Sequence, residues 1–385
     1  MKVLEIGDLK RLARRRVPRM FFDYADSGSF TEATYFANEV EFRKLKLRQR
    51  VAVNIEDRSL TSTMIGQKVA MPVALAPTGL AGMQYPNGEM IAAKVCEEVG
   101  IPFTLSTMSI CSIEDVRSAT KAPFWFQLYV MRDRGFAGSL IDRARAAGCG
   151  ALVLTLDLQI LGQRHKDLRN GLAAPPKLFN LSTLMQLAAR PRWCAQMLGT
   201  RRHTFRNIVG HARGVDDLGS LAAWTNHQFD PSLTWKDIDW IKQRWGGKLI
   251  LKGIQDPEDA ERAVEAGADA LIVSNHGGRQ LDGALSSIAS LAPVVDRVGD
   301  RIEVHMDGGI RSGQDVLKAL CVGAKGVYIG RAYLYGLGAM GKKGVRLALD
   351  IIRNELDITM ALCGESSVGA LGRHNLVEKT LDDLR

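Results

Sequence analysis

Eight short apolar runs constrain the fold of this chain more than any other feature of its sequence. Each run has four to eight residues, is rich in Val, Ile, Leu or Phe, and lacks strict alternation of apolar and polar residues. Such runs are typical of parallel strands that are buried on both faces. The runs span 73–77, 103–106, 124–129, 151–157, 249–253, 270–275, 302–309 and 326–330.

Helix-like segments separate most of these runs. The segment 256–268 has acidic residues near its start, and 312–324 opens on the capping residue Ser312. Both end in Gly-Ala before the next run, which is typical of a helix stop and a short loop into a strand. Eight β units separated by α units favour an α/β fold, a (β/α)8 TIM barrel. A doubly wound sheet is the alternative, but no G-x-G-x-x-G motif follows the first run.

We expect a single domain over residues 1–385. In this division 1–70 form an N-terminal helical extension, 71–340 carry the barrel strands, and 341–385 form C-terminal helices. The connection between the fourth and fifth runs is too long for one βα unit. It predicts a helix plus a long basic insertion after strand 4, at residues 166–222, on the face where the strands end.

The charge of the chain is concentrated in this insertion. Between Arg164 and Ser220 there are ten Lys or Arg residues and three acidic residues, a net charge of +7, compared with +9 for the whole chain. Leu, Met, Trp and Phe residues are interleaved with the basic ones. Such a segment is typical of a surface that binds an anionic partner, either phospholipid or nucleic acid.

Composition and spacing argue against several other classes of protein. The six cysteines show no C-x-x-C spacing and the seven histidines no metal-binding spacing, so we expect neither a disulfide framework nor a metal site. The basic N-terminus lacks the apolar region of a secretory signal, and no apolar run is long enough to span a bilayer. We therefore expect a cytoplasmic protein.

Each predicted strand ends at a polar or glycine residue. Active sites of (β/α)8 barrels lie at this end of the strands, so these residues are candidates for chemistry. In chain order they are Pro77, Thr78, Gly79, Ser106, Gln127, Tyr129, Thr155, Asp157, Arg164, Lys252, Ser274, His276, Arg279, Asp307, Gly308, Gly309, Arg311, Gly330 and Arg331.

Two glycine-rich segments after the last two strands predict a phosphate site. The segments DGGIRSG at 307–313 and IGRA at 329–332 can turn backbone N–H groups outward, and Arg311 can hold two phosphate oxygens. The loops after strands 7 and 8 often form such a site in this fold. Two ordinary turns that use glycine for its positive φ are the alternative.

Lys252 indicates that something negative lies in the barrel mouth. A lysine directed there is costly unless a negative group meets it. Gln127, Thr155 and Ser106 can hydrogen-bond a planar heterocycle. With the phosphate site, these residues indicate a flat cofactor that carries one phosphate, namely FMN. Without the phosphate site, Lys252 could instead form a Schiff base.

The segment SNHGGRQLDG at 274–283 contains the candidate for proton transfer. His276 follows a strand end and precedes Gly-Gly, where the backbone can come close to a ligand. Histidine is a good general base near neutral pH, and Asp157 is the best candidate to orient it. Arg279 and Arg164 can each hold a carboxylate in a bidentate pair. A structural role for His276 is the alternative.

At these residues the chain resembles the family of FMN-dependent L-2-hydroxy acid dehydrogenases and oxidases. SNHGGRQLDG is the most specific motif of that family. The similarity covers nearly the whole chain, and the order and spacing of the motifs look most like the bacterial respiratory L-lactate dehydrogenase branch. The other matching segments are FDYADSGS at 22–29, APTGLAGM at 76–83, GIPFTLST at 100–107, WFQLYV at 125–130, GQRHKD at 162–167, LKGI at 251–254, DGGIRSG at 307–313 and IGRAYLYG at 329–336.

The resemblance implies a role for each candidate residue. It implies that His276 takes a proton during oxidation of the substrate C2 hydroxyl, that Asp157 pairs with it, and that Lys252 stabilises negative charge on the reduced flavin. The implied substrate contacts are Tyr24, Tyr129, Arg164 and Arg279. The implied flavin contacts are Pro77, Thr78, Gly79, Ser106, Gln127, Thr155 and Ser274. The implied contacts of the ribityl phosphate are Asp307, Gly308, Gly309, Arg311, Gly330 and Arg331.

Two positions depart from the pattern of the family. Gly79 stands where many oxidase members have alanine beside the flavin. Met108 stands where several members have an aromatic residue that shapes the substrate pocket. Both departures weaken the case for a glycolate oxidase.

The function that the resemblance implies is FMN-dependent oxidation of L-lactate to pyruvate, with electrons passed to a membrane acceptor, a quinone or a cytochrome. The basic insertion then indicates peripheral contact with the cytoplasmic face of the inner membrane, in the respiratory chain. A solvated lid over the active site is the alternative role of the insertion. Oxidation of glycolate or mandelate, with oxygen as acceptor, is the alternative activity. By analogy we expect a homo-oligomer, a tetramer.

Two further classes of function fit the sequence less well. A basic nucleic-acid-binding protein would carry a recognisable motif, and the sequence contains no zinc finger, basic-leucine pattern or RNA-binding aromatic motif. We therefore expect no nucleic-acid partner. A phosphate-binding barrel without flavin, such as an isomerase, does not explain His276, Arg279 and Arg164 together.

Overall fold

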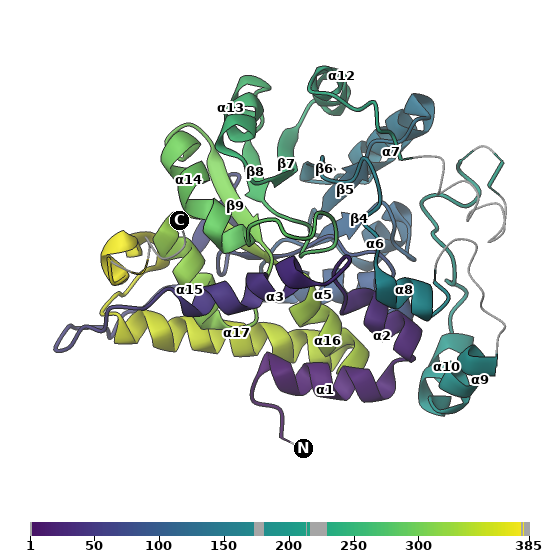
Figure 1. Ribbon diagram of the computed structural model, residues 1–385, viewed down its shortest axis with the longest axis horizontal. Coiled ribbons are helices and arrows are strands. Elements are labelled where there is room, and N and C mark those ends of the chain that lie inside the picture. Colours follow the sequence, from purple (N-terminus) through teal and green to yellow (C-terminus); the bar gives the residue numbers. More distant parts are fainter. Residues whose placement is uncertain (1, 173–180, 213, 216–228, 379, 381–385) are drawn as a thin grey trace.

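A barrel of eight parallel strands forms the centre of the molecule, with helices around it (Figure 1). The computed structural model describes residues 2–172, 181–212, 214–215, 229–378 and 380. Each of the eight apolar runs coincides with one strand, and β7 extends one residue beyond its run at each end, so the predicted fold class is confirmed. The barrel strands are β3 Val73–Leu75, β4 Thr104–Ser106, β5 Trp125–Tyr129, β6 Ala151–Thr155, β7 Lys248–Ile254, β8 Ala270–Val273, β9 Glu303–Asp307 and β10 Gly326–Ile329.

Hydrogen bonds close these strands into a cylinder. Their order is β3-β10-β9-β8-β7-β6-β5-β4, and a parallel bridge between Leu75 and Phe103 joins β3 to β4. The parallel register places Tyr129 beside Thr155, and Thr155 beside Lys252. The carboxyl ends of the strands therefore meet at one rim, which brings residues far apart in the sequence together.

Alternate residues of the strands fill the inside of the barrel. Ala74, Trp125, Val153, Ile250 and Tyr328 belong to one buried apolar cluster inside it. The residues between them, such as those at positions 73 and 75 of β3, face the surrounding helices and belong to the larger outer cluster. This period of two is the expected one for a strand, and it makes the barrel a packed core rather than a pore.

A helix follows each barrel strand and covers its outer face. The cap that the sequence predicts is formed, because Ser312 accepts from the N–H of Asp315, and the Asp256 side chain likewise accepts from the N–H of Glu258. The covering helices are α5 Gly88–Val99, α6 Ile113–Ala119, α7 Arg134–Ala146, α12 Lys236–Trp245, α13 Pro257–Glu265, α14 Ser287–Val298, α15 Gly313–Val322, α16 Arg331–Met340 and α17 Lys342–Leu362.

The segment that precedes the barrel in the sequence packs against both ends of the barrel. Helices α1 to α3 lie along α16 and the rim, whereas a hairpin of β1 and β2 covers the amino-terminal end, where Trp125 Nε1 donates to Gln67 Oε1 (3.2 Å). The sequence did not predict this hairpin, because its strands are too short to show a pattern. These elements are α1 Ile6–Arg16, α2 Arg19–Ala25, α3 Ala33–Val40, η1 Glu41–Arg43, β1 Ser62–Met64 and β2 Gln67–Val69.

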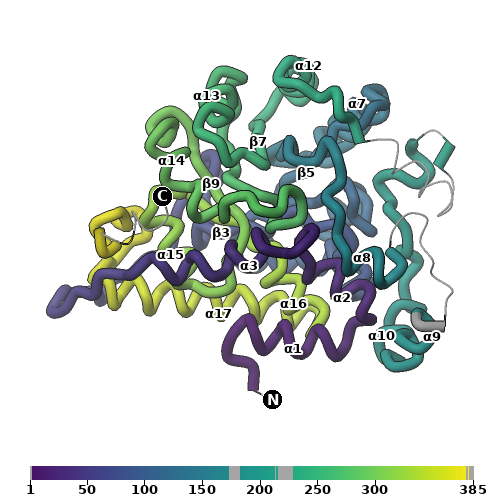
Figure 2. Tube along the Cα trace, in the orientation of Figure 1, coloured from purple at the N-terminus to yellow at the C-terminus, as the bar shows by residue number. Residues whose placement is uncertain are grey.

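The insertion after β6 packs against the N-terminal helices at the side of the barrel (Figure 2). Trp193 stacks on Phe21 of α2, with ring centroids 5.4 Å apart, and its Nε1 donates to the carbonyl oxygen of Met83 (3.0 Å). No helix in the described part of the chain is long and apolar enough to cross a membrane. The short elements that remain are α4 Ala81–Gln84, α8 His165–Arg169, α9 Leu181–Ala188, α10 Pro191–Leu198, η2 Val368–Ala370 and η3 Arg373–Asn375.

Candidate active site

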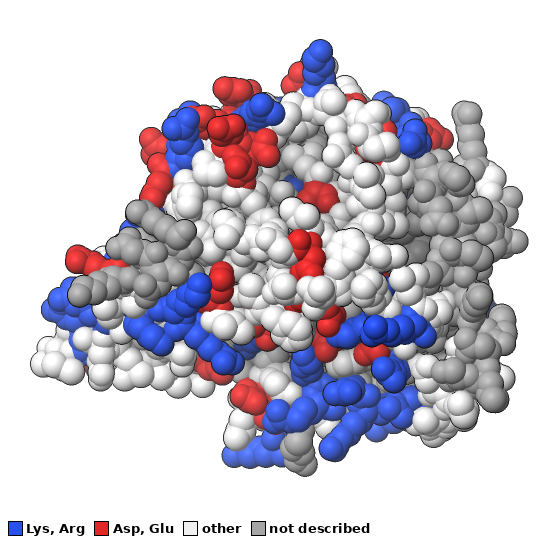
Figure 3. Space-filling view, viewed as in Figure 1, with Lys and Arg blue, Asp and Glu red and all other residues white. Residues whose placement is uncertain are grey.

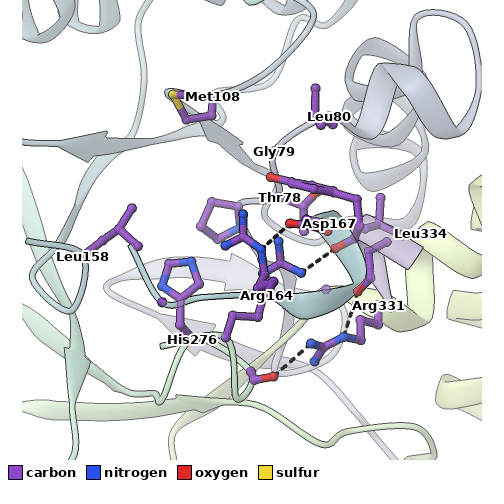
Figure 4. A pocket seen from close by; sticks show the side chains of 18 of the residues that line it. Thr78, Gly79, Leu80, Met108, Leu158, Arg164, Asp167, His276, Arg331 and Leu334 are labelled. Atoms are coloured by element: carbon purple, nitrogen blue, oxygen red, sulfur yellow. Dashed lines mark hydrogen bonds and ion pairs between the residues drawn. The ribbon is translucent and has the colours of Figure 1, made fainter. Parts of the chain in front are cut away.

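A cavity of about 690 Å³ opens at the rim where the barrel strands end. Figure 4 shows His276 and Arg164 near its centre, with Leu158 to one side and Arg331 and Leu334 to the other. The predicted site residues in its wall are Tyr24, Pro77, Thr78, Gly79, Tyr129, Thr155, Arg164, Lys252, His276, Arg279, Asp307, Gly308, Gly309, Arg311, Gly330 and Arg331. The predicted site residues that lie outside this wall are Ser106, Gln127, Asp157 and Ser274.

A chain of buried hydrogen bonds lies beneath the cavity. Ser106 Oγ donates to Gln127 Oε1 (3.1 Å), and Gln127 Nε2 donates to Thr155 Oγ1 (3.0 Å). Because the amide oxygen and nitrogen of Gln127 are both engaged, its side chain is held in one orientation. Only Thr155 reaches the cavity wall, so Ser106 and Gln127 support the floor from behind it.

Lys252 is a buried charge in the cavity floor. Its Nζ lies 3.0 Å from Asp307 Oδ2 and donates to Ser274 Oγ at 2.7 Å. Burial lowers the pKa of Lys252, but the carboxylates of Asp307 and Asp157 outweigh it and raise the pKa above its ordinary value. The ammonium therefore stays charged, which disfavours a Schiff base because that chemistry needs a neutral amine.

His276 is held by Asp157 with its other ring nitrogen directed toward Tyr129. The distance between His276 Nδ1 and Asp157 Oδ1 is 2.8 Å, and that between His276 Nε2 and the Tyr129 hydroxyl is 3.5 Å. A carboxylate only accepts, so the Nδ1 atom carries the hydrogen and Nε2 is left with a lone pair. Burial lowers the pKa of His276 more than Asp157 raises it, so the imidazole is neutral at neutral pH.

The backbone at His276 is strained. Its φ is +59°, in the left-handed region, and Gly277 and Gly278 follow at +68° and +73°. A side chain other than glycine adopts this conformation at a cost, and such residues gather at functional sites. The turn aims the imidazole into the cavity.

Two arginines flank the ring of Tyr24 in the cavity wall. The guanidinium carbon of Arg279 lies 4.8 Å from the ring centroid, and that of Arg164 lies 5.5 Å from it. Burial and then the charge of Arg164 lower the pKa of Arg279 to about 10. Arg164 also pairs with Asp167. Two guanidiniums brought this close favour a bound anion, and their planar donors match a carboxylate.

The predicted phosphate residues line the same cavity. Gly308 and Gly309 have φ of +95° and +79°, as a backbone that turns its N–H groups outward requires. Arg331 donates Nε and Nη2 to carbonyl oxygens of Ala25, Ser27 and Gly277. Its Nη1 has no hydrogen bond within the described residues and remains available to an anion.

Sequence reasoning missed most of the apolar wall of the cavity. These residues come from α2, α4 and α16, from the loops after β3, β4 and β6, from the insertion and from the segment before α12, rather than from strand ends. The only signal was the interleaving of apolar with basic residues in the insertion. The apolar wall comprises Phe21, Leu80, Met83, Met108, Ile110, Leu158, Leu161, Leu168, Leu172, Phe205, Phe229 and Leu334.

Comparison with known proteins gives a consistent result. Residues 13–378 match the family model described as FMN-dependent dehydrogenase. The chain is 45% identical over 385 residues to an L-lactate dehydrogenase of Caulobacter vibrioides, covering 98% of this chain and 99% of that one. It is 44% identical over 382 residues to an L-lactate dehydrogenase of Actinobacillus pleuropneumoniae, with the same coverage. The solved structure of the monotopic membrane protein (S)-mandelate dehydrogenase is similar with a TM-score of 0.93 and 34% identity, over 98% of this chain and 100% of that one.

The residues of the cavity fit FMN. One end offers the N–H groups of Gly308 and Gly309 with the guanidinium of Arg331, which suit a phosphate. The floor offers the charged ammonium of Lys252, which suits negative charge on a ring. Asp307 Oδ1 is buried and has no hydrogen-bond partner among the described residues, so it can accept a bond from a bound group.

Replacement of Gly253 tests whether the backbone at Gly253 holds Asp157 in position. A Cβ at Gly253, where φ is +101°, would lie 2.7 Å from Cβ and Cγ of Asp157. We expect Gly253→Ala to displace Asp157, to destabilise the fold by about 1–3 kcal/mol, and to lower the pKa of His276 further, because Asp157 is what raises it. The free energy of unfolding in denaturant and an NMR titration of the His276 imidazole measure both effects.

The matched control is Gly283→Ala, because Gly283 also has a positive φ, of +83°, but a Cβ there would meet nothing within 4 Å. This control reports backbone strain alone, and it should leave the pKa of His276 unchanged. An equal pKa change in both variants would contradict the proposed support of Asp157 by Gly253.

Proposed function

The chain belongs to the family of FMN-dependent dehydrogenases, and from this premise we propose that it oxidises an L-2-hydroxy acid, L-lactate, to its 2-oxo acid, pyruvate. The observation that carries the proposal is the His276–Asp157 pair, with Nδ1 and Oδ1 2.8 Å apart, in the cavity that Arg164 and Arg279 also line. The curated relatives support lactate as the substrate, because those named above are L-lactate dehydrogenases.

His276 supplies the base. Conversion of CH–OH to C=O releases two electrons and two protons, and His276 Nε2 accepts one of these protons. Asp157 then stabilises the imidazolium through the bond at Nδ1, without taking the proton itself. FMN, when bound, supplies the acceptor for the two electrons and the second proton.

Arg164 and Arg279 bind the carboxylate of the substrate. Both guanidiniums lie near the ring of Tyr24, so a carboxylate bound by the two of them has a fixed orientation of its adjacent C2. Tyr129 lies beside His276 and takes part in the same hydrogen-bond network. Burial raises the pKa of the Tyr129 hydroxyl, which therefore stays protonated and donates to the substrate oxygen.

A larger 2-hydroxy acid is the second candidate substrate. The wall of the cavity includes Met108, Leu158 and Phe229, which are apolar. The similar solved structure is that of (S)-mandelate dehydrogenase, whose name identifies an aromatic substrate. A comparison of L-lactate, glycolate and L-mandelate, each with a dye and with oxygen as acceptor, separates these activities.

We further propose peripheral contact with an anionic membrane and electron transfer to an acceptor there, a quinone or a cytochrome. Leu184, Met185 and Leu198 of α9 and α10 are exposed apolar side chains on a basic insertion, which suits the surface of a bilayer. The similar (S)-mandelate dehydrogenase is described as a monotopic membrane protein, which supports such a contact. The cytoplasmic face and a homo-oligomeric state stay predictions from the sequence.

Replacement of His276 tests the role of the base. The purified protein should be yellow and should lose this colour when L-lactate is added without oxygen. We expect His276→Gln to keep the colour but to slow the bleaching about 10²- to 10⁴-fold, which stopped-flow absorbance measures. Bleaching at the rate of the parent protein would refute the role of His276, whereas a colourless parent protein would refute the cofactor.

The pH dependence of kcat/KM tests the pair with Asp157. The neutral form of His276 is active, and burial lowers its pKa below the ordinary value of an imidazole, so activity is full at neutral pH and falls as the pH drops through that pKa. Asp157→Asn removes a group that raises the pKa, so the acidic limb should move to lower pH. The value of kcat/KM should also fall about 10²- to 10⁴-fold, because the imidazolium of His276 loses the carboxylate of Asp157. If the acidic limb of the kcat/KM profile moved to higher pH in Asp157→Asn, the pairing of His276 with Asp157 would be contradicted.

Point substitutions on the insertion test the membrane contact. Deletion of the whole insertion would also remove cavity-wall residues such as Phe205, so a smaller change is sharper. We expect Leu184→Ser with Leu198→Ser to reduce the membrane-bound fraction of the protein while FMN stays bound. The control is Ile358→Ser with Leu362→Ser, two comparably exposed apolar residues on α17. Sedimentation with membranes measures the membrane-bound fraction of the two double variants. An equal loss of that fraction in both variants would contradict the proposed membrane contact.

A further inference from the structure

A second cavity, of about 360 Å³, lies between α1, α2, α8 and the start of α10, and we name it the cationic cavity. Five of its lining residues are basic and two are acidic. Figure 3 shows Lys and Arg side chains gathered on the lower part of the molecule, where α1 and α2 lie. The residues that line the cationic cavity are Arg14, Arg19, Phe22, Asp23, Asp26, Lys166, Arg169, Asn170 and Arg190.

The two carboxylates of the cationic cavity already have partners. Asp26 Oδ1 accepts from the hydroxyls of Tyr35 (2.7 Å) and Tyr335 (2.6 Å) and lies 3.0 Å from Lys10 Nζ. Asp23 Oδ2 accepts from Arg19 Nε (3.1 Å) and Asn170 Nδ2 (2.9 Å). Each carboxylate is thus already paired with one cation, Lys10 or Arg19, and the two acidic groups face five basic side chains.

Three of the arginines lack an anionic partner. The side chains of Arg14 and Arg169 form no hydrogen bond or ion pair with the described residues. Arg190 Nε is buried and without a partner in the same part of the chain, although Arg190 Nη1 and Nη2 donate to carbonyl oxygens of Ala189 (2.9 Å) and Arg14 (3.4 Å). The carbonyl bonds hold the guanidinium in place and leave its charge uncompensated.

We propose that the cationic cavity binds a phosphate group. Basic side chains that outnumber the carboxylates around one cavity repel one another, and a bound anion reduces that repulsion. Phosphate presents several acceptor oxygens, and arginine binds them with two parallel N–H donors. The volume accommodates a phosphate with a small substituent. A free phosphate ester and a phospholipid headgroup carry the same group.

The cationic cavity and the active-site cavity share two walls. Phe21, Tyr24 and Ala25 of α2 line the active-site cavity, whereas Phe22 and Asp23 of the same helix line the cationic one. In α8 and its flanks, Asp167 and Leu168 face the active site, whereas Lys166, Arg169 and Asn170 face the cationic cavity. A phosphate bound there lies directly behind the carboxylate-binding side of the active site. The proposal stands independently of the identity of the substrate.

The test compares two double variants of the FMN-bound protein. Arg14→Gln with Arg169→Gln removes two unpaired arginines of the cationic cavity. Arg15→Gln with Arg192→Gln is the matched control, because both residues are exposed, lie on α1 and α10, and are absent from the cavity lining. The net charge changes by the same amount in the two double variants, because each replaces two arginines by glutamine. The flavin absorbance of each variant checks that it is folded, and all four substituted side chains are exposed.

Two probes distinguish the sources of the phosphate. Inorganic phosphate is titrated by calorimetry, and vesicles of phosphatidylcholine with and without phosphatidic acid are tested by sedimentation. We expect the Arg14→Gln, Arg169→Gln variant to bind at least one probe about tenfold or more weakly than the parent protein does. The Arg15→Gln, Arg192→Gln control should bind that probe like the parent protein. Loss for inorganic phosphate identifies a soluble ligand, and loss only for phosphatidic acid identifies a lipid headgroup. Equal behaviour of the two variants, or no binding of either probe by the parent, would overturn the proposal.

Discussion

The His276–Asp157 pair depends on a close approach between the loop after β6 and the backbone of β7. Asp157 lies against Gly253, where no Cβ fits, and the pairing of β7 with β8 shifts register at this point. The absence of a side chain lets the carboxylate lie between Lys252 and His276. Burial opposes its charge, but His276 and Lys252 outweigh burial and lower the pKa of Asp157. The Asp157 carboxylate therefore orients the imidazole and, together with Asp307, keeps the ammonium of Lys252 charged.

The loop that carries His276 is fixed from the other side by the N-terminal extension. Ser29 N donates to the carbonyl oxygen of Gly278 (2.8 Å), and Asn38 and Asn275 exchange side-chain hydrogen bonds of 2.9 Å. Arg331, which follows β10 two strands away from β8, donates to the carbonyl oxygen of Gly277 (2.9 Å). These bonds offset the strain of the positive φ at His276. The extension is therefore part of the site, although it contributes only Tyr24 to the predicted residues.

The sequence predicted the strands and most of the polar site because both follow from local patterns. Buried parallel strands read as apolar runs, and their ends converge by the geometry of the barrel, so Lys252 and His276 were found without knowledge of any contact. The apolar wall was missed because it forms from contacts between distant segments, such as that of Phe229, which precedes α12, with Tyr129 of β5, whose rings lie 5.9 Å apart. Ser106 points at its neighbour on β5 rather than at the cavity, and no sequence period encodes that difference.

The charge of the insertion has more than one use, and this limits what a net charge can indicate. Arg164 lies in the active site with Asp167, Lys166 pairs with Glu32, and Arg202 pairs with Asp115 of α6. Two of these acidic partners lie outside the segment over which the charge was summed, so the sum exceeds the charge that faces solvent. The unpaired arginines at the cationic cavity are therefore a stronger indication of an anionic partner than the total of +7, because their positions show where an anion would be held.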